Sequence, residues 1–437
     1  MGKLIEEAIP ALYNGVSRQP ASVRMTSQVQ DALNLDFSIV TGGFEKRDPL
    51  QHLGTLVGVD TAYSWTLHAI DRDETERYDV MVSSNGDVEV YDGFDGTAQT
   101  VSFAAGQEAA ITAYLTSGSD NAKRRFSFLT IVDVTYIVNR EVVTAMDTAS
   151  TGTVISQYDT FADLTTAVPS PADGAIYEIT GGASEFDNYF VAWSAADNQW
   201  IETVDPNGQN AFDVTTMPVT MTRTSLGNFE LAQVAWTERT VGSENTVPAP
   251  KWIGSPLTDI VFYKNRIGYL GASNIYFSQA GDFTNLWPDK ATDVLDSDPI
   301  DLTATGSRVS FLKWAVPYRK TLFMTADRVQ FEQSNTGLLT PFTASIDETT
   351  AYSTTNLTKP VILGSELYFA SEVSGNGIVY EYYFDDASLS NTADDVTKHV
   401  LGYVPGSITR MAADPASGKL FVMCGDSTSD LYVYSVY

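Results

Sequence analysis

The chain has 437 residues, of which 43% are hydrophobic and 19% are charged, so it suits two or three globular domains and is too apolar to be disordered. Its 26 Lys and Arg residues stand against 55 Asp and Glu residues, which gives a formal charge of −29. This charge argues against wrapping of nucleic acid and against docking on anionic membranes, because both depend on Lys and Arg.

The cysteine content and the hydropathy exclude further classes. A single cysteine, Cys424, excludes an internal disulfide framework and a cysteine-rich zinc module. The sequence contains no run of 18 apolar residues, so it predicts no membrane-spanning helix. Glu6 and Glu7 stand where a secretory signal peptide needs an apolar run, so we expect no export by that route.

Short segments rich in Val, Ile, Tyr, Phe and Thr recur between turn residues along the chain, which is typical of an all-β fold. The Asn85-Gly86 pair is a strong signal for a tight hairpin turn. In chain order, the predicted hairpin or meander units span residues 63–91, 126–143, 259–279, 321–331, 366–383 and 419–434.

Most of these units are centred about 50 residues apart, which is the spacing of propeller blades, and one gap is longer by a small domain. We therefore expect a β-propeller of about six blades with a small β-rich inserted domain. A chain of unrelated β-sandwiches is the alternative. The expected boundaries are 1–148 for an N-terminal segment and the first blades, 149–225 for the acidic insertion, and 226–437 for the remaining blades.

Composition supports the insertion independently. No Lys or Arg lies between Arg140 and Arg223, whereas twelve acids fall in that window. Within it, residues 175–179, 189–193 and 200–204 predict a small antiparallel sheet, and Thr160 to Val168 predicts a short helix.

The sequence offers little catalytic chemistry. With three histidines, no HExxH, no GxSxG and no GxxxxGK[ST], we expect no catalytic residues, no metal and no cofactor. The acidic run Asp296 to Asp301 lacks the spacing of a calcium loop and favours a solvated turn. The mixed run Asp71 to Arg77 favours a surface loop. A carboxylate pair for glycoside hydrolysis has no named candidates, because such a pair is defined by its separation in space.

Several motifs, in order, resemble the tail tubular protein B, or tail nozzle, family of short-tailed (podovirus) bacteriophages. They include Gly15-Val16-Ser17-Arg18-Gln19-Pro20, Gly43 to Pro49, His68 to Glu74, Tyr136 to Arg140, Asp259 to Leu270, Asp298 to Asp301, Lys313 to Tyr318 and Asp394 to Val400. The motif positions that we single out are Gly15, Ser17, Gln19, Pro20, Lys46, Arg47, Asn139, Arg140, Asn265, Arg266, Asp298, Pro299, Asp301 and Pro317.

The resemblance implies a structural virion protein that is not an enzyme and is assembled in the host cytoplasm. It implies a homo-oligomer, a hexameric ring below an adaptor ring of tail tubular protein A type, with tail fibres docked at its side. Phage DNA would pass through without tight binding, and no stable membrane association is expected. Family members extend well beyond the point that matches Tyr437, so a tip or fibre-docking region is either absent here or supplied by another chain.

A second function stays open at this point. Propellers host many glycan sites, so a carbohydrate-binding or glycan-cleaving β-propeller of the tail is the alternative, with fold analogy as its only support.

Overall fold

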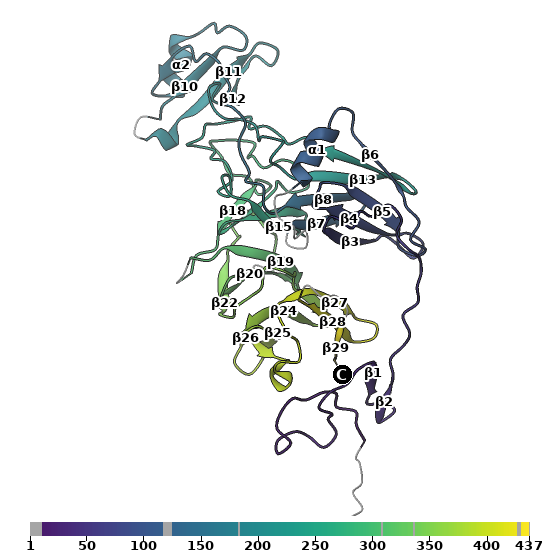
Figure 1. Cartoon of the computed structure of the whole chain (residues 1–437). Coiled ribbons are helices and arrows are strands. Elements are labelled where there is room, and N and C mark those ends of the chain that lie inside the picture. The colour runs from purple at the N-terminus through teal and green to yellow at the C-terminus, as the bar shows by residue number, and fades with distance from the viewer. Residues whose placement is uncertain are drawn as a thin grey trace, which may run out of the picture. The chain divides into compact units, whose positions relative to one another are not determined.

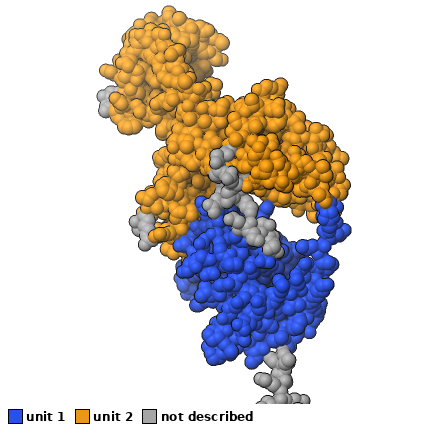
Figure 2. Space-filling view, in the orientation of Figure 1, with its two compact units in different colours: residues 1–54, 353–437 blue, residues 55–352 orange. Residues whose placement is uncertain are grey.

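The computed structural model describes residues 11–116, 125–181, 184–306, 309–334, 337–425 and 430–436. The chain forms two compact units, residues 1–54 with 353–437 (unit 1) and residues 55–352 (unit 2), coloured separately in Figure 2. Strands predominate in both units, and short helices accompany them in unit 2 (Figure 1). The all-β prediction is confirmed. The expectation about Glu6 and Glu7 concerns residues outside the described ranges.

Unit 2 opens with two sheets that share a core with helix α1 (Glu108–Leu115). The first is the meander β3 (Trp65–Asp71), β4 (Arg77–Ser83) and β5 (Val88–Asp92). The second has the order β6 (Thr100–Phe103), β14 (Asn228–Gln233), β13 (Val219–Ser225), β8 (Val134–Asn139) and β7 (Phe126–Ile131). The predicted hairpins at 63–91 and 126–143 are confirmed, and Asn85-Gly86 lies at the β4–β5 turn.

Two four-stranded meanders follow in unit 2. The first comprises β15 (Leu257–Tyr263), β16 (Arg266–Gly271), β17 (Asn274–Phe277) and β18 (Ile300–Thr303). The second comprises β19 (Leu312–Tyr318), β20 (Thr321–Ala326), β21 (Gln330–Gln333) and β22 (Asp347–Thr350). Lys264 and Asn265 both have positive φ, 47° and 60°, as a two-residue type I′ hairpin turn requires. The meander predicted at 259–279 is confirmed.

The acidic window contains a separate four-stranded sheet with its own apolar core. Its strands are β9 (Gln157–Tyr158), β10 (Ile176–Ile179), β11 (Tyr189–Ser194) and β12 (Gln199–Thr203), with a 3₁₀ turn at Glu185–Asp187. Helix α2 (Phe161–Ala167) is capped by the Thr160 side chain, which accepts from the Asp163 N–H at 3.2 Å. The three predicted strands and the predicted helix are confirmed, and Figure 1 draws them together.

Unit 1 combines an N-terminal hairpin with two sheets from the last part of the chain. The hairpin is β1 (Leu35–Ser38) and β2 (Gly43–Lys46). The sheets are β23 (Val361–Leu363), β24 (Glu366–Val373), β25 (Asn376–Asp385) and β26 (Ser390–Asp395), and, after a 3₁₀ turn at Lys398–Val400, β27 (Ile408–Asp414), β28 (Lys419–Cys424) and β29 (Tyr432–Ser435). The hairpins predicted at 366–383 and 419–434 are confirmed.

The described sheets are small, antiparallel for the most part, and separate from one another. Among the residues placed by the structure, no helix has the length and apolar character needed to cross a membrane.

Candidate functional site

The motif around Gly15 and Ser17 lies in unit 1, against the last part of the chain. Gly15 has φ +70°, a conformation that residues with a Cβ rarely adopt. Its carbonyl accepts from the Val29 N–H at 3.0 Å, and the Ser17 N–H donates back to the Val29 carbonyl at 2.8 Å. The Ser17 side chain is fully buried, and its hydroxyl lies 3.4 Å from the His399 carbonyl. The motif therefore shapes a backbone turn.

Neighbouring groups fasten this turn to unit 1. The Arg18 N–H donates to the His399 carbonyl at 2.9 Å, and its guanidinium lies over the Tyr403 ring at 5.3 Å. The Gln19 N–H donates to the Ser17 hydroxyl at 3.3 Å, and the Pro20 carbonyl accepts two backbone N–H groups at 3.0 Å. These contacts are backbone hydrogen bonds and packing contacts that hold the turn in place.

The second N-terminal motif ends the β1–β2 hairpin. Lys46 is exposed at the end of β2. The Arg47 guanidinium donates from Nε to Asn34 Oδ1 at 2.8 Å and from Nη1 to the Asp48 carbonyl at 2.9 Å. Lys419 forms an ion pair with Asp36 of β1 at 2.6 Å, which ties the hairpin to β28.

Asn139 and Arg140 end strand β8 in unit 2. The buried Asn139 side chain donates to the Tyr114 carbonyl at 2.7 Å, which fastens β8 to the end of α1. The Arg140 guanidinium lies over the buried Trp314 ring at 4.0 Å. Burial lowers the pKa of Arg140 to about 10, and the nearby Asp259 carboxylate opposes that shift.

Asp259 was not predicted as an individual site from the sequence, although its carboxylate links three strands of unit 2. It is fully buried on β15. One of its oxygens accepts from the Ala315 N–H at 2.8 Å and the other from the Ser127 hydroxyl, so the carboxylate links β7, β15 and β19. The available signal was an acid next to the apolar run Ile260 to Tyr263.

Arg266 brings two of the family motifs together. Its guanidinium is buried and donates to backbone carbonyls of the β17–β18 connection, at 2.8 Å to Ser278, 2.7 Å to Asp298 and 2.7 Å to Asp296. Burial lowers the pKa of Arg266, and Asp298 opposes that shift. Asn265 supplies the tight turn just before it, and its carbonyl accepts from the Gly281 N–H at 3.0 Å.

The run from Asp296 to Asp301 begins with the expected turn, in which Asp296 is exposed, but it differs from the expectation at Asp298. Asp298 is buried at 3% exposure, and its Oδ2 accepts from the Leu295 N–H at 2.7 Å. Asp301 pairs with Lys251 at 3.5 Å and accepts from Asn274 at 3.1 Å. Sequence reasoning missed the burial because the cation that organises the loop lies 30 residues earlier.

Pro299 and Pro317 have simpler places. Pro299 directly precedes β18, whose first residue is buried. Pro317 is exposed on β19, the first strand of its sheet, and edge strands tolerate proline because no ladder partner needs its missing N–H. Within unit 2, the contacts of Arg140 with Trp314 and of Arg266 with Asp298 each join two of the motif stretches.

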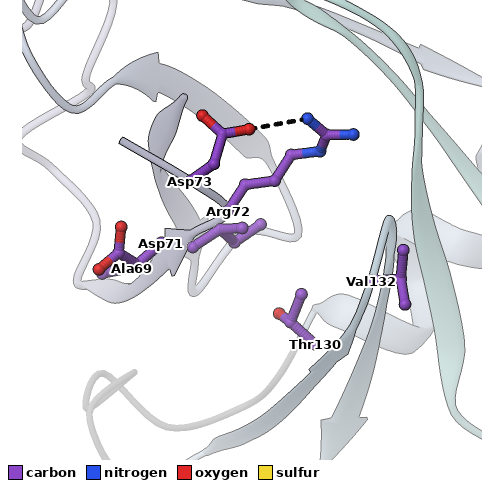
Figure 3. A pocket seen from close by; sticks show the side chains of 7 residues that line it. Ala69, Asp71, Arg72, Asp73, Thr130 and Val132 are labelled. Carbon is purple, nitrogen blue, oxygen red and sulfur yellow. Dashed lines mark hydrogen bonds and ion pairs between the residues drawn. The ribbon is translucent and has the colours of Figure 1, made fainter. Parts of the chain in front are cut away.

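The family-like stretch from His68 to Glu74 borders a shallow hollow of about 460 Å³ in unit 2 (Figure 3). Arg72 dominates it, with ion pairs to Asp73 at 3.0 Å and Asp133 at 2.8 Å. The prediction of a surface loop is confirmed, because residues 72–76 connect β3 and β4. The lining residues are Ala69, Ile70, Asp71, Arg72, Asp73, Thr130 and Val132.

Asp73 of this hollow is suited to ion pairing and not to proton donation. Hydrogen bonds from the Thr75 N–H and hydroxyl lower the pKa of Asp73, so it is ionised at neutral pH. A glycosidase acid needs the opposite shift. Among the described residues, no group of three His, Cys, Asp or Glu side chains is placed to hold a metal.

Comparisons with known proteins show what the chain resembles. The family model described as bacteriophage nozzle protein matches residues 2–154 and 149–437. The tail tubular protein gp12 of Escherichia phage T7 is 25% identical over 99% of this chain. The chain spans 66% of the length of that relative.

Solved structures give weaker similarities. The extracellular domain of a one-component system of Bacteroides thetaiotaomicron matches 85% of this chain and 38% of its own length, at 12% identity and a TM-score of 0.35. A protein of Bacteroides uniformis described as a 6-phosphogluconolactonase matches 84% of this chain and 90% of its own length, at 11% identity and a TM-score of 0.34. TM-scores of this size support no inference about the fold.

Proposed function

Because the chain belongs to the bacteriophage nozzle protein family, we propose that it is a structural subunit of a short phage tail that forms a hexameric ring and continues the DNA channel below an adaptor ring. The observation that supports this most is the family match, which extends over nearly the whole chain. Tail fibres are the proposed partners at the side of the ring. The family match does not favour the glycan-binding or glycan-cleaving alternative.

The charge of the chain supports the conducting role. Each copy contributes −29, so six copies around a channel make an acidic wall that repels phosphates and lets DNA slide. Electron microscopy of the assembled ring would identify the acids that face the channel. Replacing those acids with Lys should slow DNA ejection, and unchanged ejection kinetics would refute this role of the charge.

We further propose that the successive meanders are blades of a propeller of about six blades. Supporting this, β15–β18, β19–β22 and β23–β26 are consecutive four-stranded meanders of one connectivity. The inserted domain at 149–225 is a proposal too, supported by the separate core of β9–β12. Strand β13 lies within that range and pairs with β8. A deletion of residues 155–203, which keeps β13, is therefore a better test than deletion of the whole range. The remaining chain should still fold if the insertion is a separate domain.

The motif positions have a proposed structural role as joints between strands, and none is proposed as catalytic. Their support is the contact pattern: Ser17, Asn139 and Arg266 all bond to backbone carbonyls or lie near them. Substitution at these positions should lower the free energy of unfolding, and an unchanged free energy of unfolding would contradict this role.

Electron microscopy of the purified full chain tests the assembly directly. Sixfold rings with a continuous pore would support the nozzle role. Monomers that turn over host polysaccharide, with turnover lost on replacing one acid, would contradict it and support the enzyme.

A further inference from the structure

The N-terminal arm, defined as residues 33–53 of unit 1, exposes several large apolar side chains. Leu33 is 79% exposed, Val40 is 95% exposed and Leu50 is 83% exposed. Ile39, Phe44 and Leu53 are exposed along the same arm. Single exposed apolar residues are ordinary, whereas several of them within one arm of 21 residues are a feature of interaction surfaces.

The charge of the region differs from that of the rest of its unit. Residues 11–54 contain four Lys or Arg and four Asp or Glu residues, so they are formally neutral. Residues 353–437 contain four Lys or Arg and ten Asp or Glu residues. Two acidic copies repel each other through most of their surfaces, and a neutral apolar segment is where they approach at least cost.

The secondary structure of the arm points the same way. Its β1–β2 hairpin is a two-stranded sheet, and such a hairpin is marginally stable in water without a further covering surface. The arm is anchored at its start, because the Tyr403 hydroxyl donates to the Ala32 carbonyl at 3.0 Å and Lys419 pairs with Asp36. After β2, residues 47–54 have no strand or helix.

We propose that this arm docks on a second copy of the chain and forms the contact between neighbouring subunits. The inference rests on the proposed ring and names the surface that holds it together. A standard protein interface takes about 20–30 residues from each side, and residues 33–53 are about that many. In a closed ring every subunit then gives one arm and receives one.

Substitution provides the first test. The pair Val40→Asp and Leu50→Asp places two charges on the apolar surface, and we expect at least a tenfold rise in the concentration at which the full chain assembles, measured by mass photometry. The matched control is Leu389→Asp, since Leu389 is also an exposed leucine of unit 1, at 76%, on the β25–β26 turn. It should assemble as the wild type does. Near-ultraviolet circular dichroism verifies that each variant is folded.

Hydrogen exchange of the wild-type chain provides a second test that needs no variant. Backbone amides of residues 33–53 should exchange at least tenfold more slowly in the ring than in the dilute monomer. A ring in which they exchange equally fast would overturn the arm contact and leave the nozzle proposal standing. Protection that appears only after an adaptor protein is added would overturn it in favour of that partner. A wild-type chain that forms no ring would overturn both proposals.

Discussion

In two acidic loops of unit 2, an arginine bonds to groups of the loop, and the partners of that arginine differ with its burial. The connection around Asp296 and Asp298 folds about Arg266, which is buried and bonds to backbone carbonyls. The β3–β4 loop around Arg72 is partly exposed, and there the guanidinium pairs with carboxylates. Both loops are acid-rich in sequence, so composition alone does not separate them. We therefore expect the first loop to depend on its arginine for its conformation, and the second to gain only a small increment of stability from its ion pairs.

The largest effect is expected at Arg266. Arg266→Met removes the donors of buried carbonyls, each of which costs about 1–3 kcal/mol when it is left unsatisfied, so the free energy of unfolding should fall by about 3–5 kcal/mol. Arg266→Lys should recover only part of this, because an ammonium cannot reproduce the planar fork. Urea unfolding measures both. A loss below about 1 kcal/mol would erase the distinction between the two loops.

A second buried charge extends the comparison to strands. Asp259→Ala leaves the Ala315 N–H and the Ser127 hydroxyl without their acceptor and removes the opposite charge near Arg140, so we expect a loss of about 2–4 kcal/mol. Asp259→Asn keeps one acceptor oxygen and should lose less. Thermal unfolding ranks the variants, and equal melting temperatures for Ala and Asn would show that the hydrogen bonds are unimportant.

The exposed loop should respond weakly. Arg72→Gln removes partly exposed ion pairs, which are worth about 0–1 kcal/mol each and are screened by salt. We expect a change of about 1 kcal/mol or less in urea unfolding at low salt, shrinking further at high salt. A change as large as that of Arg266→Met would mean that the loop supports the sheet.

The smallest effect is a dependence on acid pH. The hydrogen bonds from Thr75 lower the folded-state pKa of Asp73 from 3.8, so its contribution is complete above pH 3.8 and is lost as the pH falls through the folded value. The melting temperature should therefore decline below about pH 4. Asp73→Asn should flatten that part of the curve slightly, and a steeper curve for the variant would contradict the assignment.

The sequence predicts local structure well here and long-range structure poorly. The hairpins at 259–270 and 366–383 follow from short apolar and aromatic runs separated by turn residues that lie next to them in the chain. Pairing of β6 with β14 joins Thr100 to Asn228, and no local pattern specifies such a partner. The burial of Asp298 was missed for the same reason, since it depends on Arg266.

The fastening of Ser17 and Arg18 to His399 has a consequence for synthesis on the ribosome. These partners are separated by 382 residues, and translation at about 5–20 residues per second puts them about 20–80 s apart. The segments of unit 2 emerge in between, so unit 2 has time to fold before unit 1 acquires its last strands. In a nascent chain, the N-terminal motif therefore stays undocked until residue 399 has been made. Arrest of translation before residue 399 should leave that motif accessible to protease. Release of the finished chain should protect it.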